Sequence, residues 1–420
     1  MRESRVGVVR VAAVVGLAAS LLVAGQAAAV GWTDIFGTSG EDFGFAISAG
    51  QTGVYVVGYT DGSFNSQSNP GGDSAFVRRY KANGSLVWTR IFGSNAGDVA
   101  LAASTDATGA YVAGYTAGAF GGQSNPGGDS AFVRRYNANG STAWTSIFGS
   151  SAGEQARGIA ADSNGAYVAG YTFGAFGGET NPGSASAFLR RYNANGTVAW
   201  TRIFGSAVGD AANAVALDGA GGAYVAGSTD GAFGGQSNPG GGSAFVQRYD
   251  STGTLMWTRI FGSNDSDDGY AVAANSSAVF VGGVTDGSFG GQSPTGAASS
   301  FVRKYSATGS PVWLRIFGSP SNDVLWAVDT DDEQGVYVAG ASEGSFGGQT
   351  NPGDYSPYVR HYSDVGGVIS TRIFGSGDED LGQGVAYYRT ALYVTGWTWG
   401  TFNNQANPGG RSAFAIRMAP

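Results

Sequence analysis

A repeat of about 56 residues runs through the chain from residue 30 to residue 420. A fixed period of this length is typical of a repeat architecture, in which each copy is one supersecondary unit stacked on its neighbours. Seven copies fill this region and leave no room for a second domain. Six copies open on a Trp, and the seventh has Ser in its place: Trp32, Trp88, Trp144, Trp200, Trp257, Trp313 and Ser370.

Each copy contains four short segments with the composition and spacing of β-strands. In the second copy these are residues 99–104, 110–116, 130–136 and 141–148. Asn139-Gly140, between the last two segments, is typical of a two-residue type I′ hairpin turn. Four strands in each of seven copies, with no helical stretch between them, predict an all-β, seven-bladed β-propeller with four antiparallel strands per blade.

Three motifs recur in the copies: F-G-S-x-x-x-[DE], then A-x-D-x-x-G-x-Y-V-A-G-x-T, then S-A-F-V-R-[RK]-Y. This pattern resembles the bacterial β-propeller repeat called SBBP, which occurs in exported and cell-surface proteins. The resemblance covers residues 30–420, and it implies an architecture rather than one reaction.

In propellers of similar layout the innermost strand precedes the G-x-Y-V-A-G segment, and the W-T-R-I-F-G segment is the outermost strand. That order implies that residues 31–36 are an outer strand and that residues 412–418 are a third strand. The N-terminal strand would then complete the last blade and close the ring.

Residues 1–29 have the layout of a secretory signal peptide: three Arg, an apolar run over residues 11–23, and small residues ending at Ala29. The apolar run is shorter than the roughly 20 residues that span a bilayer, so we expect cleavage after about Ala29 rather than anchoring. Cleavage removes three Arg and one Glu, which leaves 20 basic and 30 acidic residues and a net charge of −10. We therefore predict a secreted monomer with no membrane span.

Composition excludes several classes of site. The chain has no Cys, so it has no disulfide, thiol nucleophile or zinc-thiolate centre. Its single His, His361, occupies a position that Arg or Lys fills in the other copies, and we predict no catalytic role for it. The negative charge disfavours nucleic acid as a partner. We name no catalytic residue and no required cofactor, although Ca²⁺ is a candidate.

The expected strand order brings two kinds of loop to one face: the loop after F-G-S and the long loop between the second and third strands. Binding residues are concentrated on long loops carried by a rigid scaffold. One acidic residue follows F-G in each copy, at the entry of the innermost strand. These residues are candidate Ca²⁺ ligands near the channel mouth, or structural caps of the turn between blades. They are Asp42, Asp98, Glu154, Asp210, Asp267, Asp323 and Asp380.

The long loop supplies a Phe and, three residues later, a Gln or Glu in every copy. An aromatic ring beside an amide suits a sugar, so these pairs are candidate glycan-binding residues; the alternative is that each Phe packs inside its own loop. The pairs are Phe64 and Gln67, Phe120 and Gln123, Phe176 and Glu179, Phe233 and Gln236, Phe289 and Gln292, Phe346 and Gln349, and Phe402 and Gln405.

The near-uniform repeat favours a non-catalytic binding scaffold that recognises a cell-surface glycan or an exported protein through its long-loop face. The alternative is a hydrolase or lyase that uses carboxylates at the channel mouth, with or without Ca²⁺. A purely structural role, as an adhesin or coat component, is a third hypothesis.

Overall fold

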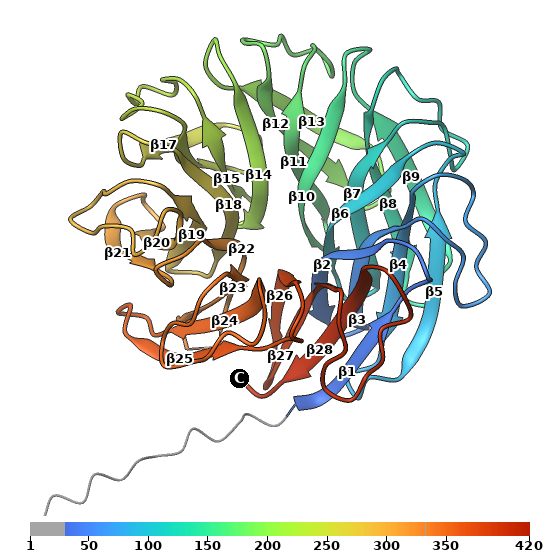
Figure 1. The fold of residues 1–420 in the computed structure, drawn as a ribbon. Coiled ribbons are helices and arrows are strands. Elements are labelled where there is room, and N and C mark those ends of the chain that lie inside the picture. Colours follow the sequence, from blue (N-terminus) through green and yellow to red (C-terminus); the bar gives the residue numbers. More distant parts are fainter. Residues whose placement is uncertain (1–29, 332) are drawn as a thin grey trace, which may run out of the picture.

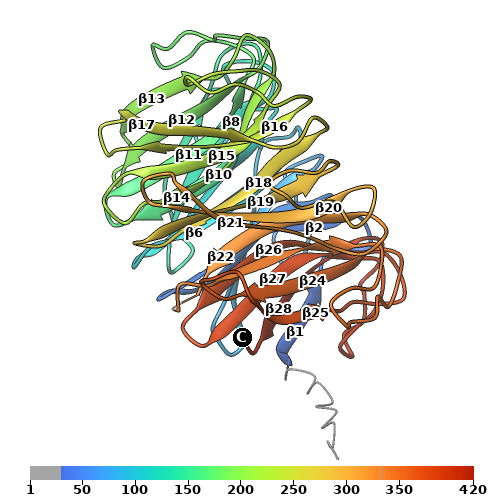
Figure 2. The ribbon, with the colours of Figure 1, turned by 90° about the vertical axis from the view of Figure 1, so that its left-hand side faces the viewer.

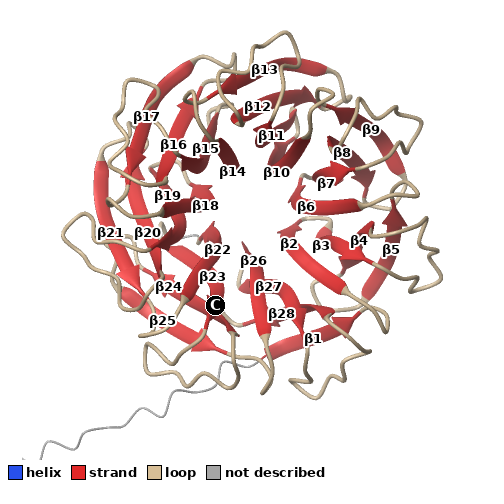
Figure 3. Ribbon diagram, turned by 45° about the horizontal axis from the view of Figure 1, so that its top comes forward, coloured by secondary structure: helices blue, strands red, loops and turns tan. Residues whose placement is uncertain are grey.

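The computed structural model describes residues 30–331 and 333–420. These residues form 28 strands in seven four-stranded antiparallel sheets, and no helix occurs among them. The sheets stand radially around a central channel (Figure 1, Figure 3). The predicted all-β, seven-bladed propeller is therefore confirmed. The predicted signal peptide, residues 1–29, lies outside the described residues.

Blades 1 to 6 run outward from the channel in chain order, and in blade 7 the outermost strand is the first strand of the described chain. Blade 1 contains β2 (Asp42–Gly50), β3 (Gly53–Thr60), β4 (Ser74–Tyr80) and β5 (Leu86–Phe92). Blade 2 contains β6 (Asp98–Thr105), β7 (Gly109–Thr116), β8 (Ser130–Asn137) and β9 (Thr142–Phe148). Blade 3 contains β10 (Glu154–Asp162), β11 (Gly165–Thr172), β12 (Ser186–Asn193) and β13 (Val198–Phe204). Blade 4 contains β14 (Asp210–Leu217), β15 (Ala223–Thr229), β16 (Ser243–Tyr249) and β17 (Leu255–Phe261). Blade 5 contains β18 (Asp267–Ala274), β19 (Ala278–Thr285), β20 (Ser299–Ser306) and β21 (Pro311–Phe317). Blade 6 contains β22 (Asp323–Thr330), β23 (Val336–Ser342), β24 (Ser356–Tyr362) and β25 (Val368–Ile373). Blade 7 contains β26 (Asp380–Tyr388), β27 (Ala391–Thr398), β28 (Ser412–Met418) and β1 (Val30–Phe36).

Blade 7 closes the ring from the two ends of the described chain. Its outer strand is β1, which pairs antiparallel with β28 through partners such as Ile35 and Phe414. Figure 1 shows β1 and β28 side by side, in blue and red. The predicted closure by the N-terminal strand, with the inner and outer strands assigned as expected, is confirmed.

The apolar core lies between blades. The second strand of each sheet is buried on both faces, as in Tyr55, Val56 and Val57, because a blade packs against it from either side. Each core cluster joins neighbouring blades; one contains Val57 of blade 1 and Phe132 of blade 2. A blade therefore buries its faces only when its neighbours are present. Figure 2 shows the stacked blades from the side.

A Trp on the outer strand links each of six blades to the next. The Trp88 indole N–H donates to the carbonyl of Ala138, 2.9 Å away, in the last hairpin turn of the following blade. Gly140 of that turn lies against the indole, and a Cβ there would come within 3.0 Å of the ring. The neighbouring Arg90 lies over the same ring and donates to the Gly140 carbonyl. The same Trp-to-carbonyl bond occurs at Trp32, Trp144, Trp200, Trp257 and Trp313.

The link accounts for the copy that lacks Trp. Ser370 lies on β25 of blade 6, where a Trp would reach the last hairpin turn of blade 7. Blade 7 has no such turn, because its third strand, β28, and its outer strand, β1, come from opposite ends of the chain. In place of the turn, Arg372 donates to the carbonyls of Ala419 and Pro420.

The predicted hairpins form, but the predicted type I′ turn is wrong. Gly140 has φ of +84°, whereas Asn139 is not among the residues with positive φ. The Gly140 N–H donates to the Asn137 carbonyl and the Asn137 N–H to the Ser141 carbonyl, with a register shift after Arg135. This is a three-residue loop with a bulge at Gly, which also matches the twist of the strands. The register shift between Arg135 and Tyr136 then places Arg135 opposite Trp144, the pairing that a two-residue turn would also produce.

We predict that Trp88→Ala lowers the free energy of unfolding by about 3 kcal/mol, because the side chain is almost fully buried against the next blade. Ser370→Ala, at the equivalent position of blade 6, is the control and should change it by less than about 0.5 kcal/mol. Urea unfolding of both variants tests this, and equal losses would contradict the link.

We also predict that deleting residues 30–36 lowers the urea midpoint far more than the control Ile369→Ala. The deletion removes β1, leaves β28 as an open edge and removes the Trp32 link to blade 1. Ile369 is exposed on the outer strand β25. Coincident unfolding curves for the deleted and intact proteins would show that β1 does not close the ring.

Candidate functional site

The long loops and the inter-blade loops share one face, which we call the loop face, and the tight turns share the other. Gly71 of the first long loop approaches Asn95 of the next inter-blade loop, and Gly409 approaches Ser39 in the same way across the seam. The predicted arrangement of loops is confirmed.

The seven carboxylates at the entries of the inner strands cap turns. They are 0–3% exposed. Asp98 Oδ2 accepts the Ser94 N–H and hydroxyl at 2.7 and 3.0 Å, and its other oxygen accepts the Thr116 hydroxyl of the neighbouring strand. Burial raises the pKa of the six Asp members: Asp42, Asp98, Asp210, Asp267, Asp323 and Asp380.

These carboxylates do not converge. Each one, Glu154 included, bonds within its own blade and the turn before it. Among residues 30–331 and 333–420, no group of three or more His, Asp or Glu side chains is placed to hold a metal ion. The geometry favours the turn-capping alternative; Ca²⁺ binding at these positions stays a prediction.

The seven loop Phe side chains pack inward. Each ring meets an aromatic ring of the third strand of its own blade edge-on. The ring centroids of Phe120 and Phe132, for example, are 5.4 Å apart, and the ring planes make an angle of 80°. Phe120, Phe176, Phe289, Phe346 and Phe402 are buried, and Phe64 and Phe233 are half-buried. The geometry therefore favours the loop-packing alternative.

The Gln and Glu side chains of these loops lie at the surface, and two of them bond to the outer strand. Gln292 accepts the Ile316 N–H at 3.0 Å, and Glu179 pairs with Arg202 at 3.1 Å. Glycan binding by the loop pairs stays a prediction, because most of the rings offer no free face.

A different set of residues converges at the loop-face end of the channel. Every inner strand carries a β-bulge at its fourth residue, where the register with the second strand shifts by one. A bulge aims an extra side chain away from the ladder. All seven bulge residues line the central cavity of about 480 Å³: Phe45, Leu101, Arg157, Asn213, Tyr270, Trp326 and Gln383. We call this set the mouth ring.

The mouth ring differs in every blade. The residue that follows each bulge is Ala or Gly in all seven blades, because the inner strands approach closely there; a Cβ at Gly158 would lie 2.9 Å from Ala214 Cα. The bulge residue itself points to open space and carries seven different side chains. The position breaks an otherwise uniform repeat, and this is the signal by which alignment of the copies would have found it.

The mouth ring is rich in aromatic and hydrogen-bonding groups. Tyr270 and Trp326, from neighbouring blades, stack with ring centroids 4.9 Å apart and an angle of 29° between the ring planes. Phe45 lies 5.9 Å from Phe43, which stacks on Tyr59 at 4.9 Å. The Arg157 guanidinium donates to Asn213 Oδ1 at 2.9 Å. The ring itself contains no carboxylate.

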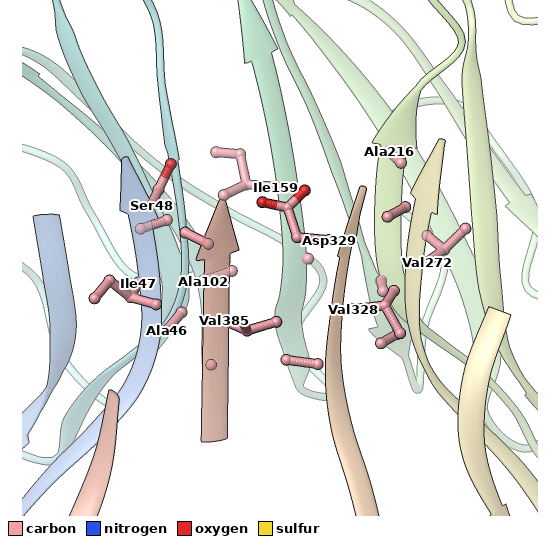
Figure 4. A pocket seen from close by; sticks show the side chains of 18 of the residues that line it. Ala46, Ile47, Ser48, Ala102, Ile159, Ala216, Val272, Val328, Asp329 and Val385 are labelled. Carbon is pink, nitrogen blue, oxygen red and sulfur yellow. The ribbon is translucent and has the colours of Figure 1, made fainter. Parts of the chain in front are cut away.

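One acidic side chain lies deeper in the channel. Asp329 takes the position of Ser48 and Ser104 and lies among small and apolar side chains (Figure 4). Its Oδ2 accepts the Tyr387 N–H of the next blade at 2.7 Å, and its Oδ1 accepts the Thr330 N–H at 2.9 Å. Burial outweighs these hydrogen bonds and raises the pKa of Asp329 to about 7.

No model of a known protein family and no curated protein matches the chain. Among solved structures it is similar to the phage phi92 endosialidase, with 10% identity and a TM-score of 0.48 over 92% of this chain and 69% of that chain. It is also similar to the parainfluenza virus 5 hemagglutinin-neuraminidase ectodomain, with 8% identity and a TM-score of 0.47 over 92% of this chain and 84% of that chain. Identities this low and TM-scores below 0.5 carry no functional information to this chain. Within its described part, the chain forms no helix that is long and apolar enough to cross a membrane.

We predict that Asp329 makes the protein less stable as pH rises. Its folded pKa of about 7 lies above the ordinary value of 3.8 for an Asp carboxyl, so near neutral pH the folded state holds a proton that the unfolded state has lost. The stabilisation of the folded state by this proton is full below about pH 4 and is lost as pH rises through 7. Between pH 5 and pH 8 the urea-derived free energy of unfolding should fall by about 2–3 kcal/mol more than in Asp329→Ser, which keeps a hydroxyl as in blades 1 and 2. Parallel pH profiles would contradict the assignment.

Proposed function

We propose that the protein is an exported, non-catalytic binding scaffold that recognises a surface glycan at the mouth ring. The observation that carries this proposal is the ring itself: seven blades of nearly one sequence place seven different side chains around one cavity. Folding alone requires no such variety, since the other repeated loop-face features bond and pack within the scaffold. The predicted signal peptide and the SBBP resemblance support export.

The chemistry of the ring suits a glycan. A sugar ring has apolar faces, which stack on aromatic rings, and hydroxyl edges, which exchange hydrogen bonds with amides and guanidinium groups. The mouth ring offers Phe45, Tyr270 and Trp326 for the faces, and Arg157, Asn213 and Gln383 for the edges. An exported protein is the other partner class that we expected; the small concave cavity of the channel favours the glycan.

The distribution of carboxylates supports binding over hydrolysis. Glycoside hydrolysis generally requires two carboxyl groups that flank the scissile bond. The mouth ring has none, the carboxylates at the strand entries bond to turns, and Asp329 lies deeper with both oxygens accepting backbone N–H groups.

A glycan array with the mature protein tests the proposal. Tyr270→Ala and Trp326→Ala should each weaken binding of the best array glycan tenfold or more by calorimetry, because each removes a stacking surface. Ile369→Ala, exposed on the outer strand β25, is the control and should bind as wild type. Wild-type affinity in both ring variants at an unchanged melting temperature would refute the site. Release of shorter glycans during incubation would refute the non-catalytic role.

A further inference from the structure

A second cavity, of about 260 Å³, opens on the loop face between blades 3 and 4. Tyr171, at the end of β11, and Phe173, just after it, form one side, while Ser228 and Asp230 of blade 4 also line it. Arg157 of the mouth ring lines this cavity as well as the channel. We call it the side pocket, and it shares the side chain of Arg157 with the proposed glycan site.

Two positions that vary between blades shape the side pocket. Ala185, the last residue of its long loop, stands where blades 1 and 2 have Asp73 and Asp129, and the smaller side chain leaves space beside Tyr171. Phe173 stands where blade 1 has Asp61 and blade 2 has Ala117. Compared with blades 1 and 2, blade 3 therefore has an open space in place of an acidic side chain and, beside it, an aromatic ring in place of an acidic or small side chain.

The walls carry three complementary groups. The Phe173 side chain is 51% exposed and meets Tyr171 edge-on at 5.4 Å, so one aromatic face is free. Arg157 lies over the Tyr171 ring at 4.7 Å, which orients its guanidinium. Within the described residues, that guanidinium makes one hydrogen bond, to Asn213, and its other N–H groups are free to donate. The exposed Asp230 carboxylate supplies acceptors.

We propose that the side pocket is a subsite for one neutral pyranose residue of the glycan, and this inference rests on the proposed function. An exposed aromatic face stacks on a sugar ring, while a guanidinium and a carboxylate bond to its hydroxyl groups. The volume lies just below the roughly 300–1,000 Å³ of pockets for drug-sized ligands, which fits one ring rather than several. A carboxylated sugar is disfavoured because Asp230 offsets Arg157 and the whole chain is acidic.

Saturation-transfer NMR with the mature protein tests this directly. The probes are the methyl pyranosides of glucose, galactose, mannose and N-acetylglucosamine, each offered alone at millimolar concentration. The wild type should bind at least one, and Phe173→Ala and Asp230→Asn should each weaken that binding tenfold or more. Trp399→Ala is the matched control, because Trp399 is an exposed aromatic at the equivalent position of blade 7, outside both cavities, and its loss should change nothing.

A mouth-ring variant separates this inference from the proposed function. Trp326→Ala should weaken the array glycan but leave pyranoside binding intact, whereas Phe173→Ala should weaken both. No binding of any pyranoside to the wild type, or wild-type binding by Phe173→Ala, would overturn the subsite even if the array glycan binds at the mouth ring. Pyranoside binding that depends on Phe173, with no glycan bound on the array, would uphold the subsite and refute the mouth ring.

Discussion

The contact between the Trp of one blade and the last hairpin turn of the next is the interaction on which the ring depends. A four-stranded blade cannot cover its own apolar faces, so its stability comes from its neighbours. The indole fills the space over a Gly and donates to a carbonyl of the same turn, which sets the position of the next blade. Closure removes this turn from blade 7, and the outer strand of blade 6 that would face it has Ser370 instead of Trp.

The same constraint separates structural from functional positions. Residues that repeat from blade to blade bond or pack within the scaffold: Asp98 caps a turn, Phe120 fills a loop and Trp88 joins two blades. Residues that differ between blades face open space, as Tyr270 and Trp326 do in the channel. In a repeat protein, recognition of an asymmetric ligand requires such differences, because identical blades present one chemistry seven times.

The sequence predicted the architecture closely and the site poorly. The Trp spacing and the turn residues indicated the blade number, and the strand order of similar propellers indicated closure by residues 31–36. The same reasoning selected the repeated pairs, such as Phe120 and Gln123, as candidate ligands, since they were the conspicuous loop motifs. It missed the mouth ring because the ring consists of β-bulges. A bulge is a departure from strand register, and the residue types at Phe45 and Arg157 do not predict one. It did not predict the raised pKa of Asp329, which arises from burial inside a channel formed by all seven blades.

The sequence by itself determined the number of blades, the strands of each blade and the hairpins between them, because these follow from a short period of apolar residues and Gly-containing turns. Only the tertiary structure decided which of the repeated groups remain free to bind. Carboxylates and aromatic rings with the same local sequence are buried or open according to what the neighbouring blade places against them. The convergence of Arg157, Tyr270 and Trp326 on one cavity depends on the closed ring, because residues more than 50 positions apart in sequence come together only when the blades meet around the channel.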